Sequence, residues 1–172
     1  TYLMQLGMTP FFKKKKPSPY DEAVNLTWYL QNIFYNSAGN IISSLRKNLF
    51  LNPGHLQLIQ LGFWPGGDRD GNPFVNTDIT LSVARRLKET ILKCYYSDIR
   101  IIRRRISFTG VYEKLLKIEQ QLLDSIRGKD SLDCDSFKNG IQSILDDLNT
   151  HHKGVFKELL EDFLDRITLF GF

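Results

Sequence analysis

Apolar residues recur every three or four positions along most of the chain, a spacing that predicts amphipathic helices. The first helical region is expected over residues 20–54, beginning near Tyr20 or Asp21 and stopping at the Leu-Asn-Pro-Gly turn that ends in Gly54. Gly39 is predicted to break this region into two segments. The apolar positions at helical spacing are Ala23, Val24, Trp28, Phe34, Ile41, Ile42, Leu45 and Leu49.

Residues 77–172 are predicted to be helical as well. A long helix capped by Asn76 or Thr77 should run to about Ser107, and a second one should end at Gly128. Leucine and isoleucine at helical spacing need a packed partner, so these stripes predict the core. Their members are Val83, Leu87, Ile91, Tyr95, Ile99 and Ile102; Val111, Leu115, Ile118, Leu122 and Ile126; Phe137, Ile141, Ile144, Leu145 and Leu148; and Val155, Leu159, Leu160, Phe163, Leu164 and Ile167.

The stretch from His55 to Trp64 is short, apolar and closed by Pro-Gly-Gly, which favours a strand buried on both faces. A single strand cannot satisfy its backbone hydrogen bonds without neighbours, so the strand predicts a fragment of a larger fold. Residues 1–19 are expected to be a loop or linker, because Lys13 to Lys16 precede two prolines. The prediction is one incomplete, mainly α domain over residues 1–172, with one short strand at about 55–64 and four to six helices.

Composition narrows the class only a little. The 172 residues are 42% hydrophobic and 24% charged, which is globular composition, and 23 basic against 19 acidic residues is a mild excess. Cys94 and Cys134 lie far apart without paired spacing, which predicts neither a zinc site nor a disulfide framework and favours a reducing cytoplasm. No apolar stretch approaches the roughly 20 residues that span a bilayer, so no membrane is expected.

The stretch LGFWPGGDRDGNPFVN, Leu61 to Asn76, contains the candidate chemistry. Gly66 and Gly67 can bring backbone N–H groups close to an anion, and the following helix start adds a favourable dipole. Arg69 offers a planar fork for a phosphate or carboxylate, while the flanking carboxylates could hold this arginine, bind a metal or simply make turns. An EF-hand calcium loop fails, because its sixth position is Pro73 and its twelfth is Ile79, and no Gly-Lys-Ser/Thr follows to make a phosphate-binding Walker loop.

The sequence FWPGGDRDGNPFVN resembles the phosphoenolpyruvate carboxylase family, whose signature is Trp-x-Gly-Gly-Asp-Arg-Asp-Gly-Asn-Pro. All nine specified letters match, KPSPYDEA precedes them as in the family, and DRITLFGF is similar to the lead-in to the next barrel strand. The resemblance implies a helical fragment of a (β/α)8-barrel enzyme of the cytoplasm, a lyase that uses Mg²⁺ or Mn²⁺ to join phosphoenolpyruvate and bicarbonate into oxaloacetate and phosphate. This anaplerotic carbon fixation replenishes the tricarboxylic acid cycle.

By position, the resemblance implies an active-site wall in which Trp64 lines an apolar pocket and Arg69 contacts an anion or orients a group that does. The wall residues are Trp64, Gly66, Gly67, Asp68, Arg69, Asp70, Gly71 and Asn72. No histidine of this chain is followed by proline, so none matches the family's catalytic His-Pro-Thr motif, and the adjacent His151 and His152 are expected at surface or cap positions.

The family resemblance also implies partners. They are phosphoenolpyruvate, bicarbonate, the remainder of the same polypeptide and further copies in a homotetramer, with no metal bound by this fragment and no activity from it alone. The alternative is a non-catalytic helical interaction module that binds nucleic acid through Lys13 to Lys16 and Arg103 to Arg105. Basic runs are usually solvated faces, and adjacent arginines on a helix cannot form one stripe, so neither nucleic acid nor a membrane is expected as a partner.

Overall fold

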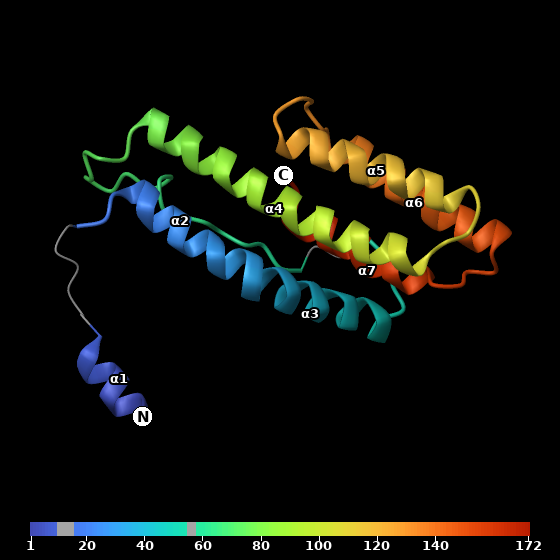
Figure 1. The fold of residues 1–172 in the computed structure, drawn as a ribbon, viewed down its shortest axis with the longest axis horizontal. Coiled ribbons are helices and arrows are strands. Elements are labelled where there is room, and N and C mark those ends of the chain that lie inside the picture. Colours follow the sequence, from blue (N-terminus) through green and yellow to red (C-terminus); the bar gives the residue numbers. More distant parts are fainter. Residues whose placement is uncertain (10–15, 55–57) are drawn as a thin grey trace.

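The structure, a computed structural model, describes residues 1–9, 16–54 and 58–172. These residues form seven α-helices and one π-helical segment (Figure 1). The prediction of a mainly α chain is therefore confirmed, although four to six helices were expected. The elements are α1 (Tyr2–Met8), α2 (Pro19–Tyr29), η1 (Leu30–Phe34), α3 (Tyr35–Asn48), α4 (Thr77–Arg105), α5 (Val111–Ile126), α6 (Cys134–His151) and α7 (Lys157–Phe170).

The first two helices begin where local hydrogen bonding directs them. Ser18 and Asp21 form a reciprocal capping box, and Pro19 occupies the first helical position, so α2 starts one residue before the predicted Tyr20. Helix α1 lies inside the range expected to be loop or linker, and none of its residues is buried. The described chain therefore packs from α2 onward.

Helices α2 and α3 join end to end through η1 (Figure 1), so the predicted break at Gly39 is wrong. The Tyr35 N–H donates to the Leu30 carbonyl five residues back, which is the π-helical pattern. Helix α2 packs on α4, whereas α3 packs on α7. Among the residues expected in the core, Phe34 and Ile41 are 51% and 52% exposed, and Trp28 ahead of the π turn is 57% exposed.

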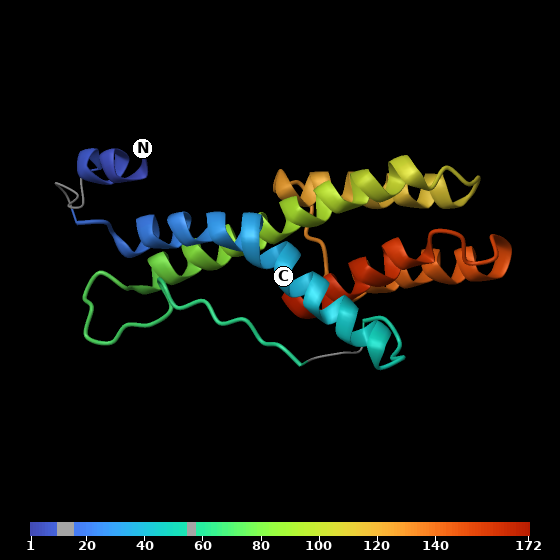
Figure 2. The ribbon, with the colours of Figure 1, turned by 90° about the horizontal axis from the view of Figure 1, so that it is seen from below.

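The predicted strand at 55–64 is wrong over residues 58–64. Residues 58–64 have no regular secondary structure, His55 to Gln57 lie outside the described residues, and no strand occurs within the described ranges. Figure 2 shows this segment running as irregular chain below α2 and α4. The physical reason is that no neighbouring strand within the described ranges supplies backbone partners for it.

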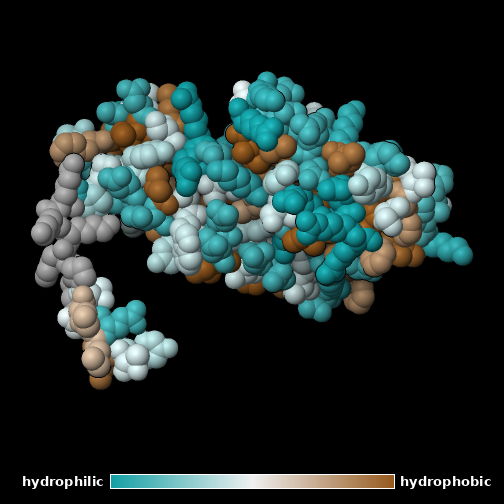
Figure 3. Space-filling model, in the orientation of Figure 1, coloured by the Kyte–Doolittle hydropathy of each residue, from teal (hydrophilic) through white to brown (hydrophobic). Residues whose placement is uncertain are grey.

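The core lies between α4, α5, α6 and α7, with α3 closing one side. Tyr95 on α4 is fully buried and contacts the rings of Phe137, Phe163 and Phe172. The four predicted apolar stripes from α4 to α7 supply most of the core, with Val155 an exception because it is exposed and precedes α7. On the face drawn in Figure 3, the surface over these helices is largely hydrophilic, with apolar side chains in small separate groups.

None of the helices in the described ranges is both long enough and apolar enough to cross a membrane.

Candidate functional site

The loop of the signature begins at a glycine that is fixed against α4. Pro65 and Gly66 are buried. The Thr80 hydroxyl on α4 donates to the Gly66 carbonyl at 2.6 Å. Gly66 has φ +77°, and a Cβ at this position would lie 2.6 Å from Cγ2 of Val83. Only glycine suits both the backbone angle and the contact with α4.

The backbone N–H groups after this glycine are used within the loop. The Trp64 carbonyl accepts the Gly67 N–H at 2.9 Å and the Asp68 N–H at 3.1 Å. Sequence reasoning offered the Gly67 N–H as an anion donor, but in this structure it closes a turn. These backbone hydrogen bonds therefore hold the shape of the loop.

Asn72 organises the second half of the loop. Its side-chain Oδ1 accepts the Phe74 N–H at 3.0 Å, an Asx turn, and its carbonyl accepts the N–H of the buried Val75 at 3.2 Å. Gly71 and Asp70 both have positive φ, +73° and +25°. These contacts favour the turn-making reading for Asn72.

Arg69 projects from the exposed part of the loop without a charged partner. Asp68, Arg69 and Asp70 are all exposed, and none of them forms an ion pair with the residues that the structure describes. The flanking carboxylates therefore do not neutralise the guanidinium by direct contact. It borders a shallow hollow of about 470 Å³. The residues around this hollow are Arg69, Gly71, Asn72, Pro73, Val75 and Asn76.

The start of α4 closes the loop. The Asn76 side chain accepts the Ile79 N–H at 3.0 Å, which confirms the predicted N-cap. Because Asn76 also borders the hollow beside Arg69, the positive end of the α4 dipole lies close to the loop's one arginine. The arrangement suits a small anion better than a cation.

Trp64 is 77% exposed and borders an apolar groove of about 690 Å³. The groove is lined by Leu26, Tyr29, Leu30, Phe34, Leu61, Gly62, Phe63, Trp64 and Pro65. The family resemblance implied an apolar pocket at Trp64, but the groove residues on α2 and η1 were not predicted. The apolar residues between Leu26 and Phe34 are the sequence feature from which this groove could have been predicted.

The two cysteines are free thiols whose pKa values are raised by burial. Burial raises the pKa of the Cys94 thiol to about 11, with Asp98 adding to the rise, and burial also raises the pKa of Cys134. Neither forms a disulfide. Both are protonated near neutral pH, as expected of plain buried or half-buried thiols.

No group of three histidine, cysteine, aspartate or glutamate side chains within the described ranges could hold a metal ion. His151 ends α6 and is exposed, while His152 caps that helix and stacks on Phe108 with ring centroids 4.6 Å apart. Both histidines are thus at the surface or cap positions expected of them.

Of the two basic runs, the structure describes only Lys16 of the first and the whole of the second, in which one arginine is engaged with a carboxylate. Arg103 is half-buried and donates to Glu119 at 2.5 Å and to the Tyr112 hydroxyl at 2.8 Å. Arg104 and Arg105 are exposed, and Lys13 to Lys15 lie outside the described residues. An arginine held by a carboxylate is poorly placed to bind a phosphate backbone.

These features define an α-helical chain with an exposed glycine-rich loop, an unneutralised arginine and an apolar groove. A phosphoenolpyruvate carboxylase family model matches residues 3–143. Relatives named phosphoenolpyruvate carboxylase include one from Shewanella halifaxensis, 30% identical over 123 residues, and one from Salmonella gallinarum, 30% identical over 121 residues. These matches cover 66% and 67% of this chain but only 14% of each relative.

The chain belongs to the phosphoenolpyruvate carboxylase family. It spans about one seventh of the length of the curated relatives that it matches.

Proposed function

We propose that this chain is part of an enzyme that carboxylates phosphoenolpyruvate with bicarbonate to give oxaloacetate and phosphate. Family membership supports the reaction, and the observation that carries the site is the exposed Arg69, which has no ion-pair partner among the described residues. A guanidinium without a carboxylate can accept a phosphate or carboxylate from solution. The loop from Trp64 to Asn72 is then one wall of the active site.

In this reaction bicarbonate takes the phosphoryl group, which leaves carboxyphosphate and the enolate of pyruvate. Carboxyphosphate splits into carbon dioxide and phosphate. The enolate carbon then bonds to the carbon dioxide to give oxaloacetate. The enolate must be kept from water, because protonation would give pyruvate instead. An apolar surface around Trp64 suits that need, and a cation such as Arg69 suits the substrate's negative groups.

The remaining loop residues have supporting roles in this proposal. Gly66 lets the backbone pass close to α4, and Asn72 holds the turn that presents Arg69. Asp68 and Asp70 adjust the charge of the wall without direct pairing. The described residues contain no group of three metal-ligating side chains, and the chain spans about one seventh of its relatives. In this proposal the metal site therefore lies in the rest of the polypeptide, and the chain alone is inactive.

The test is oxaloacetate formation from phosphoenolpyruvate, bicarbonate and Mg²⁺, measured for this chain, for the full-length protein that contains it, and for two full-length variants. Arg69→Ala should lower kcat/KM by at least about tenfold, the effect of one charge-assisted contact. Arg104→Ala, an exposed arginine on α4 far along the helix from the loop, is the matched control and should leave activity unchanged. A full-length protein without activity would overturn the reaction, and an undiminished Arg69→Ala variant would overturn the role of the arginine.

A further inference from the structure

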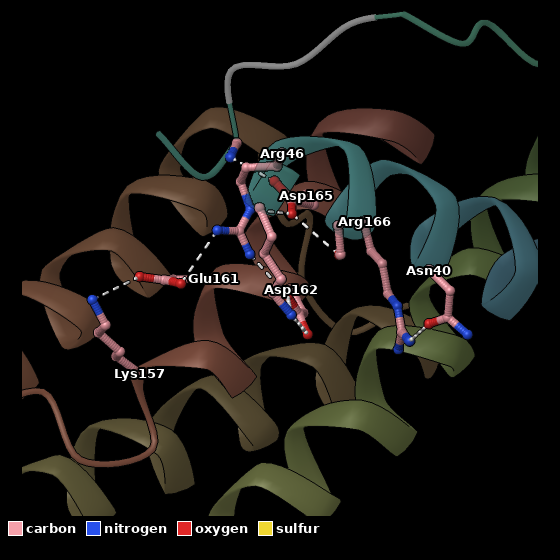
Figure 4. Close-up of polar contacts among 10 residues, drawn as sticks. Asn40, Arg46, Lys157, Glu161, Asp162, Asp165 and Arg166 are labelled. Atoms are coloured by element: carbon pink, nitrogen blue, oxygen red, sulfur yellow. Dashed lines mark hydrogen bonds and ion pairs between the residues drawn. The ribbon is translucent and has the colours of Figure 1, made fainter. Parts of the chain in front are cut away.

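A buried ionic cluster joins α3 to α7 (Figure 4). Arg46 on α3 is only 4% exposed, and three carboxylates on α7 surround its guanidinium. Its Nε donates to Oδ2 of Asp165 at 2.6 Å and its Nη2 donates to Oδ1 of Asp162 at 2.8 Å. Glu161 completes the set at 3.3 Å from Nη1.

The second carboxylate oxygen of Asp165 makes a hydrogen bond outside the ion pair with Arg46. Its Oδ1 accepts the backbone N–H of Gly54 at 2.9 Å. The Gly54 carbonyl in turn accepts the Lys138 ammonium at 2.8 Å and the Thr168 hydroxyl at 2.9 Å. Both backbone groups of one glycine are thus held by side chains of α6 and α7.

The fit around this glycine is close. Gly54 is buried with φ +71°, and a Cβ there would lie 3.3 Å from both Lys138 Cε and Thr168 Oγ1. Asp165 is 1% exposed, so removing its bond to Gly54 would leave a buried carboxylate oxygen without a partner. The cluster therefore fixes the position of Gly54 as firmly as it fixes α3.

Gly54 stands just ahead of the segment that leads into the signature loop. Leu58 follows four residues later, a separation of at most about 14 Å along an extended chain. Residues 58–64 have no regular secondary structure, and the next backbone anchor is the Gly66 carbonyl bonded to Thr80 on α4. The approach to the loop is thus held at two points, one on α7 and one on α4.

We propose that Asp165 is a positioning residue that acts through Gly54 to fix where the chain enters the signature loop. The inference rests on the proposed function only in that the loop serves the active site. It assigns Asp165 a role that neither the apolar pattern nor the signature indicates. The ion pair with Arg46 holds the carboxylate in place, and the bond to Gly54 transmits that placement to the loop.

The test separates the bonds to Gly54 from the charge pairing of Arg46. Thr168→Val combined with Lys138→Met removes both donors to the Gly54 carbonyl and leaves Arg46 and its carboxylates untouched. Asp165→Asn weakens the bond to the Gly54 N–H together with the ion pair. Asp162→Asn is the matched control, because it removes a carboxylate from Arg46 without touching Gly54.

The first readout is backbone amide exchange by NMR on the full 172-residue chain. The double variant and Asp165→Asn should speed exchange at Gly54 by about tenfold or more, the scale of a hydrogen bond to a charged group, and should shift the resonances of residues 58–66. Exchange at Ile99 in the core of α4 reports any general loss of stability. In the control Asp162→Asn, the resonances of residues 58–66 should not shift beyond any general change reported by Ile99.

The positioning role is wrong if the resonances of residues 58–66 shift equally in the control and in the double variant. It is also wrong if they shift in neither. The second readout is steady-state kinetics of the full-length protein, where the double variant should raise KM for phosphoenolpyruvate or lower kcat at least threefold while Asp162→Asn does not. An NMR response in a full-length protein without carboxylase activity would overturn the proposed function but leave the anchoring of the segment standing. An NMR response with unchanged kinetics in an active enzyme would overturn the link between Asp165 and the active site.

Discussion

Arg166 on α7 lies directly over Gly39 on α3. A Cβ at Gly39 would lie 2.8 Å from Nε and 2.9 Å from Cγ of Arg166. The arginine cannot easily move aside, because its Nη1 donates to Asp98 at 2.6 Å and its guanidinium lies 5.1 Å from the centre of the Tyr35 ring. The glycine in the middle of α3 is therefore explained by close packing between helices, not by a break in the helix.

Gly39→Ala should destabilise the chain although alanine is the better helix former. Crowding against Arg166 should cost about 1–3 kcal/mol, and the gain in helix propensity should return about 1 kcal/mol. Urea unfolding followed by circular dichroism measures the difference. Gly140→Ala on α6 is the control, because its Cβ would meet only Ile118 Cδ1 at 3.6 Å, an ordinary contact. A Gly39→Ala variant as stable as Gly140→Ala would show that Arg166 can move.

Gly66→Ala should be more harmful than Gly71→Ala, although both glycines have positive φ. Strain at positive φ costs about 1 kcal/mol at either position. At Gly66 the new methyl would also lie 2.6 Å from the stiff side chain of Val83, whereas at Gly71 nothing lies within 4 Å. We expect a loss of about 2 kcal/mol or more at Gly66 and about 1 kcal/mol at Gly71 in urea unfolding. Equal losses would mean that the loop is not fixed against α4.

Arg46→Met should be strongly destabilising. It would leave Asp165, whose side chain is 0% exposed, without its charged partner, a change that costs about 3–5 kcal/mol. Lys47→Met is the control, since the pair between Lys47 and Asp162 is partly exposed and should contribute about 0–1 kcal/mol. Thermal unfolding of the two variants checks this. Similar melting temperatures would contradict the buried cluster.

Stability should fall as the pH rises above about 9. The ordinary pKa of a cysteine thiol is 9.0, and burial raises that of Cys94 to about 11. Between these values the native state keeps a proton that the unfolded chain releases, so the free energy of unfolding decreases as pH rises through this window. Cys94→Ala should flatten the curve between pH 9 and about 10, before the buried tyrosines contribute. An unchanged slope would show that Cys94 is not protected in the native state.

Much of the fold follows from the spacing of apolar residues. The stripes on α4 to α7, from Ile91 to Ile167, were placed correctly in the core, with Val155 the exception. Leucine and isoleucine at helical spacing have one stable solution, a shared core. The cap at Asn76 could also be predicted from the sequence, since its hydrogen bond is local. Long-range contacts could not be predicted in this way. Nothing near Arg46 in the sequence indicates that Asp165, more than a hundred residues later, will bury its charge.

The segment after Gly54 shows a different limit. Apolar letters between two turn signals fit a buried strand, but a strand exists only where neighbours provide backbone partners. In the described structure Leu58, Leu61 and Trp64 are 63%, 44% and 77% exposed. The loop itself was located through its signature, while the bonds that shape it, such as Thr80 to Gly66, depend on the packing of α4.

The π-helical turn at Leu30 to Phe34 sets the angular phase between the two halves of one long rod. A regular α-helix advances about 100° per residue, so deleting a single residue here would turn everything beyond it by that angle. Arg46 would swing away from α7, and the buried Ile42 would turn toward solvent. Insertions and deletions in this five-residue segment therefore differ from those in a surface loop. The length of the segment determines which face of α3 packs against α7, so it is constrained in the way that the identity of a core residue is.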